Sequence, residues 1–123
     1  MFDFCRDLVV RGQQFDVVGI LGVFYHIMSH YELLALARRL EAKLIIIDAS
    51  FLRAKRPLII IKVERTESRL NALSSVEGQE QTPIGVVSIP ALEVMAKSLG
   101  YSAYPVDWTD SREHATCCSQ LLP

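Results

Sequence analysis

The chain has 123 residues, of which half are hydrophobic and 22% are charged. This is the size and composition of a single globular domain, residues 1–123, and it excludes an intrinsically disordered chain. The formal net charge is −1. The sequence therefore gives no sign of the basic surface with which proteins bind nucleic acids or anionic lipids.

No segment resembles a membrane span or an export signal. The longest apolar run, Val17–Met28, is shorter than the roughly 20 residues that cross a bilayer. An acidic residue also stands near the N-terminus, where a signal peptide carries basic residues. The three cysteines, Cys5, Cys117 and Cys118, suit a reducing compartment and lack zinc-ligand spacing. We therefore expect a cytoplasmic protein without a metal site.

The first predicted strand covers Phe15 to Phe24, after a mixed N-terminal segment, residues 1–14. This run is nearly continuous in apolar residues and rich in valine, a pattern typical of a strand that is buried on both faces of a parallel sheet. Ser29 and Glu32 then have the spacing of a capping box. They introduce an amphipathic helix that the apolar spacing predicts over residues 30–42.

A second β-branched run, Lys43–Asp48, follows that helix. The order of strand, helix and strand predicts a right-handed βαβ unit with two parallel strands. A third apolar run, Pro57–Val63, begins with a proline, which suits the first position of a strand or a sheet edge. Residues 66–83 are polar and rich in turn formers, and we expect them to form either a lid or an unstructured insert.

The last predicted helix begins after Ser88, whose hydroxyl is a good N-cap, and has Pro90 in its first turn. Gly100 is placed to end this helix in the left-handed conformation. Alternation of side chains over Tyr101–Trp108 predicts a final strand. Residues 111–123 are expected to form a tail.

Together these elements predict an α/β fold with an open, mostly parallel sheet and flanking helices. Ligands of such sheets bind outside the carboxyl ends of the strands. We therefore expect Gly22–His26 and Asp48–Phe51 to face a ligand.

The stretch "FDVVGILGVFYHI", which starts at Phe15, resembles the fourth-strand motif of class I S-adenosylmethionine-dependent methyltransferases, with Phe24 where the family usually has leucine. The stretch "YELLALARRLEAKLIIIDASF" resembles the next helix and fifth strand of that family. "IGVVSIPALEVMAKSLGY" and "YPVDWTD" resemble a late helix and a closing strand. The resemblance extends from Phe15 to Asp110 and implies a Rossmann-like methyltransferase fold.

The family binds S-adenosylmethionine mainly through a glycine-rich turn after the first strand and an acid after the second. No Gly-x-Gly-x-Gly occurs in this sequence. The chain therefore resembles the C-terminal half of such a domain and lacks the half that holds the cofactor. We expect the isolated chain to bind S-adenosylmethionine weakly or not at all.

The resemblance also assigns roles to individual residues. It places Leu21, Gly22 and Asp3 at the cofactor. Tyr25 would donate a hydrogen bond to the substrate or pack beneath the methionine part of the cofactor.

His26 is the candidate catalytic base, because the ordinary pKa of histidine lies near neutral pH. A histidine that lines a cleft should be partly open to solvent and lie close to Asp48 or Phe51. From the residues alone, Tyr25 and His26 could equally cap the strand and support the helix that follows, and that alternative stays open.

Three functions remain open at this stage, and the methyl acceptor is not identified by any of them. The chain is a truncated or split methyltransferase that needs a complementary N-terminal half. Alternatively, it is a catalytically inactive α/β module for dimerisation or binding, or its likeness is only architectural. In the family the fourth strand lies beside the first, which is missing here. We therefore expect the strand over residues 15–24 to be an exposed edge, covered by that complementary half or by a second copy in a homodimer.

Overall fold

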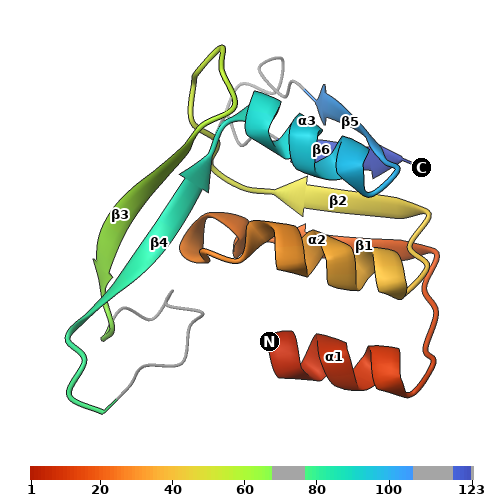
Figure 1. Ribbon diagram of the computed structural model, residues 1–123, viewed down its shortest axis with the longest axis horizontal. Coiled ribbons are helices and arrows are strands. Elements are labelled where there is room, and N and C mark those ends of the chain that lie inside the picture. The colour runs from red at the N-terminus through yellow and green to blue at the C-terminus, as the bar shows by residue number, and fades with distance from the viewer. Residues whose placement is uncertain (68–76, 107–117, 123) are drawn as a thin grey trace, which may run out of the picture.

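A computed structural model describes residues 1–67, 77–106 and 118–122 (Figure 1). The elements in chain order are α1 (Phe2–Val10), β1 (Val17–Leu21), the 3-10 helix η1 (Phe24–His26), α2 (His30–Arg39), β2 (Leu44–Asp48), β3 (Ile59–Arg65), β4 (Gln81–Val87), α3 (Ile89–Ser98), β5 (Ser102–Val106) and β6 (Cys118–Leu122). They confirm the α/β class, and the N-terminal segment contributes a helix.

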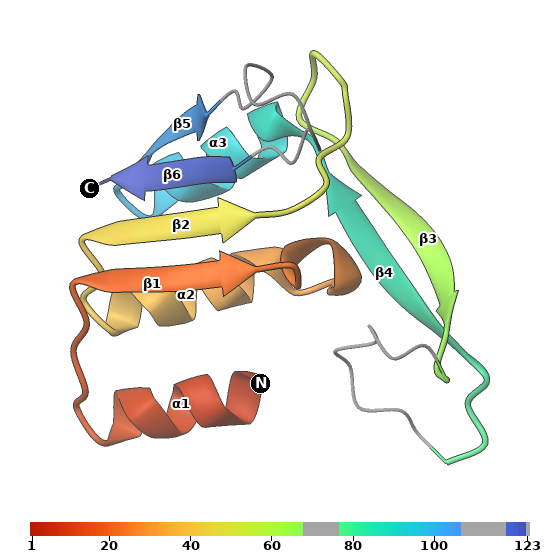
Figure 2. The ribbon, with the colours of Figure 1, turned by 180° about the vertical axis from the view of Figure 1, so that it is seen from behind.

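A four-stranded sheet in the order β1-β2-β6-β5 forms the body of the molecule (Figure 2). β1 and β2 are parallel, as the βαβ unit predicts, and their register runs from Val17 opposite Leu44 to Leu21 opposite Asp48. β6 is antiparallel to both β2 and β5. The expected mostly parallel sheet is therefore not confirmed, because the last strand returns between β2 and β5. β5 nevertheless runs in the same direction as β1 and β2, because both β2 and β5 are antiparallel to β6.

The expected C-terminal tail is wrong for residues 118–122, because these residues form β6 in the interior of the sheet. Two further expectations, the end of the final strand at residues 107–108 and the position of Cys117, lie outside the described residues. β1 is an edge strand of the described sheet, as expected from the missing first half.

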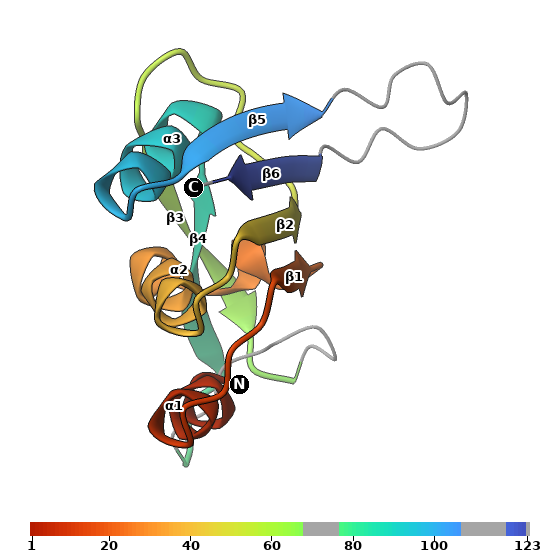
Figure 3. The same ribbon diagram turned by 90° about the vertical axis from the view of Figure 1, so that its right-hand side faces the viewer.

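The helices α1, α2 and α3 all lie on one side of the four-stranded sheet (Figure 3). Ile20, Ile45 and Ile47 are buried in the core on the sheet. Val17 and Leu21 of β1, in contrast, are 53% and 65% exposed. The prediction that β1 is buried on both faces is wrong, because no described element covers the other face of the sheet.

β1 is shorter than the predicted strand because Gly22 turns the chain. Its φ of +68° is left-handed, a conformation that glycine adopts without strain. The N–H of Gly22 donates to the carbonyl of Asp48 at 2.8 Å, which holds the turn against the end of β2. The turn leads into η1, which places Phe24 fully inside the core.

β3 and β4 form a separate antiparallel hairpin, in register from Ile59 opposite Val87 to Arg65 opposite Gln81. The predicted third strand therefore exists, two residues later than expected, but it does not join the main sheet. The expected loop over 66–83 is wrong at its end, where Gln81–Pro83 belong to β4. Residues 68–76 of that loop lie outside the described residues.

Pro83 is compatible with β4 because of its position in the ladder. The backbone N–H of Ser88 donates to Leu58, and that of Thr66 donates to Glu80. In an antiparallel ladder, hydrogen-bonded and non-hydrogen-bonded residue pairs alternate, and these two bonds show which pairs are which. Pro83, opposite Val63, belongs to a non-hydrogen-bonded pair. Its missing N–H therefore costs no bond of the hairpin.

The two predicted helix caps have different outcomes. The hydroxyl of Ser88 accepts from the N–H of Ala91 at 3.2 Å, and Gly100 has a left-handed φ of +83°, so both ends of α3 are confirmed. Ser29 makes no side-chain cap bond at the start of α2. The capping box is wrong because the carboxylate of Glu32 instead forms an ion pair with Arg6 of α1.

Gly85 of β4 is a point of close contact between the hairpin and the body. A Cβ at this position would lie 2.5 Å from Cε1 of His30 and 3.2 Å from the carbonyl oxygen of Ile27. We predict that Gly85→Ala lowers the free energy of unfolding by about 1–3 kcal/mol, because the buried neighbours must move. Urea unfolding measures this effect.

Gly19→Ala is the matched control, because a Cβ on Gly19 meets only the side chain of Leu21 at an ordinary distance of 3.7 Å. We expect this substitution to change the free energy of unfolding by less than about 0.5 kcal/mol. Equal effects of the two substitutions would contradict the contact at Gly85.

Candidate functional site

The carboxyl ends of β1 and β2 lie at the same edge of the sheet, as expected for parallel strands (Figure 2). The N-terminus of α1 lies toward the same end of the molecule. Gly22, η1 and Asp48 therefore meet at this edge, which we call the carboxyl edge. It is the place at which an open α/β sheet binds ligands.

Gly22 and Asp48 form the floor of the carboxyl edge. Nothing lies within 4 Å of the position that a Cβ of Gly22 would occupy, so the backbone there is open to an approaching group. The Oδ1 atom of Asp48 is buried and has no hydrogen-bond partner in the part of the chain that the structure describes. A buried carboxylate oxygen normally has such a partner.

The other predicted site residues lie at the end of β1 and on the segment after it, except Asp3, which is on α1. Leu21 is 65% exposed, at the end of β1. Asp3 lies in the first turn of α1, where its exposed side chain pairs with Arg6 at 2.8 Å. The ring of Tyr25 is partly buried and lies 4.2 Å from that of His26, centroid to centroid. The structure thus gathers Leu21, Gly22, Tyr25 and His26 on one segment.

His26 is buried, with 3% of its surface exposed, so the expectation of a partly open ring is wrong. Its Nδ1 lies 2.9 Å from Oε2 of Glu64 on β3. In the neutral ring Nδ1–H donates to the carboxylate, and Nε2 carries the lone pair. That Nε2 atom has no hydrogen-bond partner among the described residues. The carboxylate of Glu64 thus fixes the orientation and the tautomer of the His26 ring.

Glu64 is the residue that the sequence analysis missed. It is separated from His26 by 38 positions and lies on a strand outside the main sheet. The available signal was weak: a single acid at the end of an apolar run, without a spacing that relates it to His26.

His30 is also buried, and it binds the hairpin in the opposite tautomer. Its Nε2–H donates to the carbonyl oxygen of Gly85 at 3.0 Å, and its ring packs edge-on against Phe24 at 4.9 Å. Burial lowers the pKa of His30 below its ordinary value, and the nearby carbonyls of Gly85, Met28 and Phe24 oppose this shift only in part. His30 is therefore held neutral.

A metal site on His26 and His30 is not supported by this geometry. The two rings bind different residues of the hairpin. Over residues 1–67, 77–106 and 118–122, no three His, Cys, Asp or Glu side chains are grouped to hold a metal ion.

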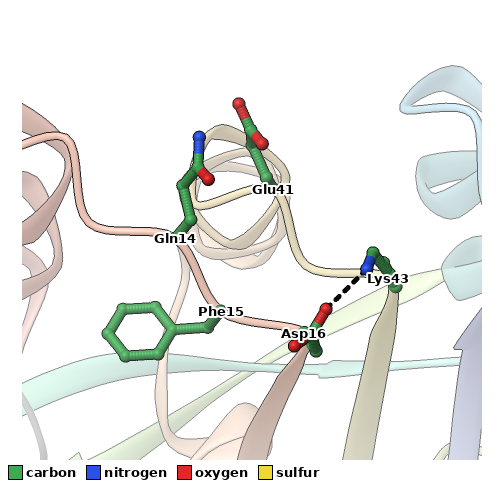
Figure 4. Close-up of a pocket in the computed structure, with 5 residues that line it drawn as sticks. All are labelled: Gln14, Phe15, Asp16, Glu41 and Lys43. Atoms are coloured by element: carbon green, nitrogen blue, oxygen red, sulfur yellow. Dashed lines mark ion pairs between the residues drawn. The ribbon is translucent and has the colours of Figure 1, made fainter.

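Two surface pockets lie away from the carboxyl edge. One, of about 270 Å³, is lined by Gln14, Phe15, Asp16, Glu41 and Lys43 at the opposite ends of β1 and β2 (Figure 4). Asp16 and Lys43 form an ion pair of 2.7 Å, which lowers the pKa of Asp16 and raises that of Lys43. Both side chains are 77% exposed, so the pair is a solvated surface contact of little energetic weight.

The second pocket, of about 280 Å³, lies at the far end of the hairpin and is lined by Arg65, Glu67, Glu80 and Gln81. Its lining is charged and highly exposed. Neither pocket contains a residue that the sequence analysis assigned to a site.

No family model and no curated protein matches the sequence. Among solved structures, the fold is similar to that of the N-terminal domain of EvdMO1, which was crystallised with SAH bound. The TM-score is 0.57 and the sequence identity is 17%, and the match covers 93% of this chain but only 47% of that chain. The chain thus spans about half the length of the chain whose fold it resembles.

None of the helices in the described parts of the chain is both long enough and apolar enough to cross a membrane.

We predict that His30 makes stability depend on pH. Its pKa is lowered in the folded state, so below its ordinary value of 6.5 the unfolded chain takes up the proton more readily. The free energy of unfolding should be highest above pH 6.5 and should fall as the pH drops from 7 to 5. Urea unfolding at several pH values measures this slope.

His30→Gln is the control, because its side-chain amide can still donate to Gly85 but does not titrate. The slope between pH 7 and pH 5 should be smaller in this variant. The same slope in both proteins would show that another group is responsible.

We also predict that the carboxylate of Glu64 is needed as the hydrogen-bond acceptor of the buried His26 ring. Glu64→Ala leaves a buried N–H without an acceptor and should lower the free energy of unfolding by about 1–3 kcal/mol. Glu64→Gln keeps an acceptor and should cost less. Lys62→Ala, on the same strand and exposed, is expected to change stability by less than about 0.5 kcal/mol. If Glu64→Ala were as mild as Lys62→Ala, the pair would contribute nothing to the fold.

Proposed function

We propose that the chain is the second half of a Rossmann-like domain that binds S-adenosylmethionine and transfers its methyl group. A second polypeptide segment would supply the first half of the sheet and the glycine-rich turn. The observation that carries this proposal is the combination of an open β1 edge and a bare sheet face in a fold that matches 47% of an SAH-bound chain.

The bare face supports this reading because large side chains with apolar surface are exposed on it. Val17, Leu21 and Tyr104 are each more than half exposed. An α/β sheet normally carries helices on both faces. A complementary half would extend the sheet at β1 and cover this face with its own helices.

The chemistry of the bound product agrees with the motif resemblance. SAH, S-adenosylhomocysteine, is what S-adenosylmethionine becomes once its methyl group has been transferred. In the proposed complex the open backbone at Gly22 and the side chain of Leu21 would contact this cofactor, with Asp3 of α1 near the same end. The methyl acceptor is not identified.

His26 would act as the proton acceptor for the substrate, with Glu64 as the residue that positions it. Nε2 has the required lone pair, and the carboxylate would balance a positive charge on the ring from 2.9 Å. Nε2 is buried in this structure, so proton transfer would also require the carboxyl edge to open at His26 when substrate binds.

The alternative function is a catalytically inactive module for dimerisation or binding. The burial of Nε2 of His26 and Oδ1 of Asp48 favours it, because neither atom is open to a substrate in this structure. In this alternative the His26–Glu64 pair only ties the hairpin to the body. A second copy, pairing through β1, would then cover the open edge.

We predict that the chain alone binds S-adenosylmethionine or SAH with a Kd no tighter than about 1 mM, equivalent to about 4 kcal/mol. Titration calorimetry should show much tighter binding when the polypeptide encoded next to it is added. Leu21→Lys should prevent this gain, because it places a charge on the surface to be covered.

Val94→Lys provides the control, since Val94 on α3 is 60% exposed but lies on the helical side of the sheet. It should leave the gain unchanged. Micromolar binding by the chain alone would contradict the need for a second half, and no binding in either sample would favour the inactive module.

A further inference from the structure

β3 exposes an unusual amount of apolar side chain on the free edge of the hairpin. Its four apolar residues are exposed, Ile59 by 48%, Ile60 by 42%, Ile61 by 63% and Val63 by 64%, and so is Leu58 just before it, by 46%. The paired strand, in contrast, buries Thr82, Ile84 and Val86. The exposed residues alternate in direction along the strand, so β3 is apolar on both of its faces.

The backbone of β3 is also open for pairing. The hydrogen bonds of Leu58 and Thr66 with β4 assign the inward-facing N–H and C=O groups to the even-numbered residues. The groups of Ile59, Ile61 and Val63 therefore point away from β4. No strand of the described ranges pairs with this side. An exposed, apolar strand edge of this kind is a template for another strand.

We propose that a second copy of the chain docks on β3, with the two β3 strands antiparallel about a two-fold axis at Ile61. In this arrangement Ile61 lies opposite the partner's Ile61, and Ile59 lies opposite the partner's Val63. The two hairpins become one four-stranded sheet, which is more stable than an isolated two-stranded ribbon.

The residues of β3 favour this register over its neighbours. Pairing about Val63 would give a ladder of the same length, but it would place Ile61 opposite the partner's Arg65. It would also place Lys62 opposite the partner's Glu64, whose carboxylate is already bonded to His26. Pairing about Lys62 would give the longest ladder but would place two lysines opposite one another, which is destabilising. Pairing about Ile60 leaves a shorter ladder within the strand. Pairing about Ile61 places Ile60 opposite the partner's Lys62 and brings no like charges together. It also lines up three apolar residues of each strand, Ile59, Ile61 and Val63, on one face.

A second copy fits this edge better than an unrelated strand because the edge is complementary to itself under two-fold symmetry. The proposal is independent of the proposed function, which concerns the β1 edge of the other sheet. The proposed dimer interface is nevertheless connected to the candidate site, because β3 also carries Glu64, whose carboxylate binds His26. Pairing would fix the strand that positions this carboxylate.

Sedimentation equilibrium of the 123-residue chain at tens of micromolar tests the association. We expect a dimer, and we expect Ile61→Lys to be monomeric with an unchanged far-ultraviolet circular dichroism spectrum. Val94→Lys is the control for a new surface charge and should remain dimeric. A wild-type monomer would overturn the proposal. A dimer that survives Ile61→Lys but is lost in Leu21→Lys would also overturn it, because the interface would then be on β1.

Cysteine cross-linking tests the register without relying on a disruptive variant. Residues 60 and 62 of opposite copies form a pair without backbone hydrogen bonds, in which the Cα atoms are about 4.5 Å apart, within disulfide range. An oxidised mixture of Ile60→Cys and Lys62→Cys chains should form a disulfide dimer above the wild-type background, and each variant alone should not. Cross-linking of Lys62→Cys alone or of Ile60→Cys alone would move the axis to that residue and overturn the register.

Discussion

At Gly85 the backbone of the hairpin packs closely against the body and forms hydrogen bonds to it. The N–H of Gly85 donates to the carbonyl of Ile27 at 2.9 Å, and its own carbonyl accepts from the ring of His30 at 3.0 Å. Both bonds require β4 to pass closer to the body than any side chain at this position allows. Because the hairpin is held there, Glu64 reaches His26. The geometry of the candidate site therefore follows from the absence of a side chain at a residue outside it.

Two histidines four positions apart have different chemical roles because their partners differ. His30 donates to an uncharged carbonyl in a buried position, and so it is held neutral. His26 donates to a carboxylate, and a proton accepted at its other nitrogen would be balanced by that charge. The segment that ends β1 thus supplies two buried rings that both bind the hairpin, one to a carboxylate and one to a backbone carbonyl. This accounts for a polar Tyr25-His26 pair at the end of so apolar a run.

The sequence predicted those features that depend on neighbouring residues. The β1-α2-β2 unit follows from local periodicity, and the Ser88 cap and the Gly100 turn follow from the chemistry of single residues. The missed features depend on distant residues. β4 contains Pro83 and Gly85, and both residue types lower the strand propensity of a sequence. Pro83 fits because its position in the ladder needs no N–H. Gly85 fits because the strand passes close to the body there. The tail predicted at the C-terminus is wrong for β6, because β6 forms a strand only through its pairing with β2 and β5, which local sequence does not reveal. Glu64 could not be paired with His26 without knowing where the hairpin docks.

The two apolar surfaces of the molecule belong to different sheets. The bare face of the main sheet is continuous with the open edge of β1, so the proposed complementary half would have to supply both strands and covering helices there. The edge of β3 is a narrow apolar ribbon, which the proposed second copy would cover. If both proposals hold, two copies of the chain, each bound to a complementary half, would form a two-fold assembly that is joined through the β3 strands. In such an assembly the strand that carries Glu64 lies between the two-fold axis and the carboxyl edge, so association and the arrangement of the candidate base are coupled through β3.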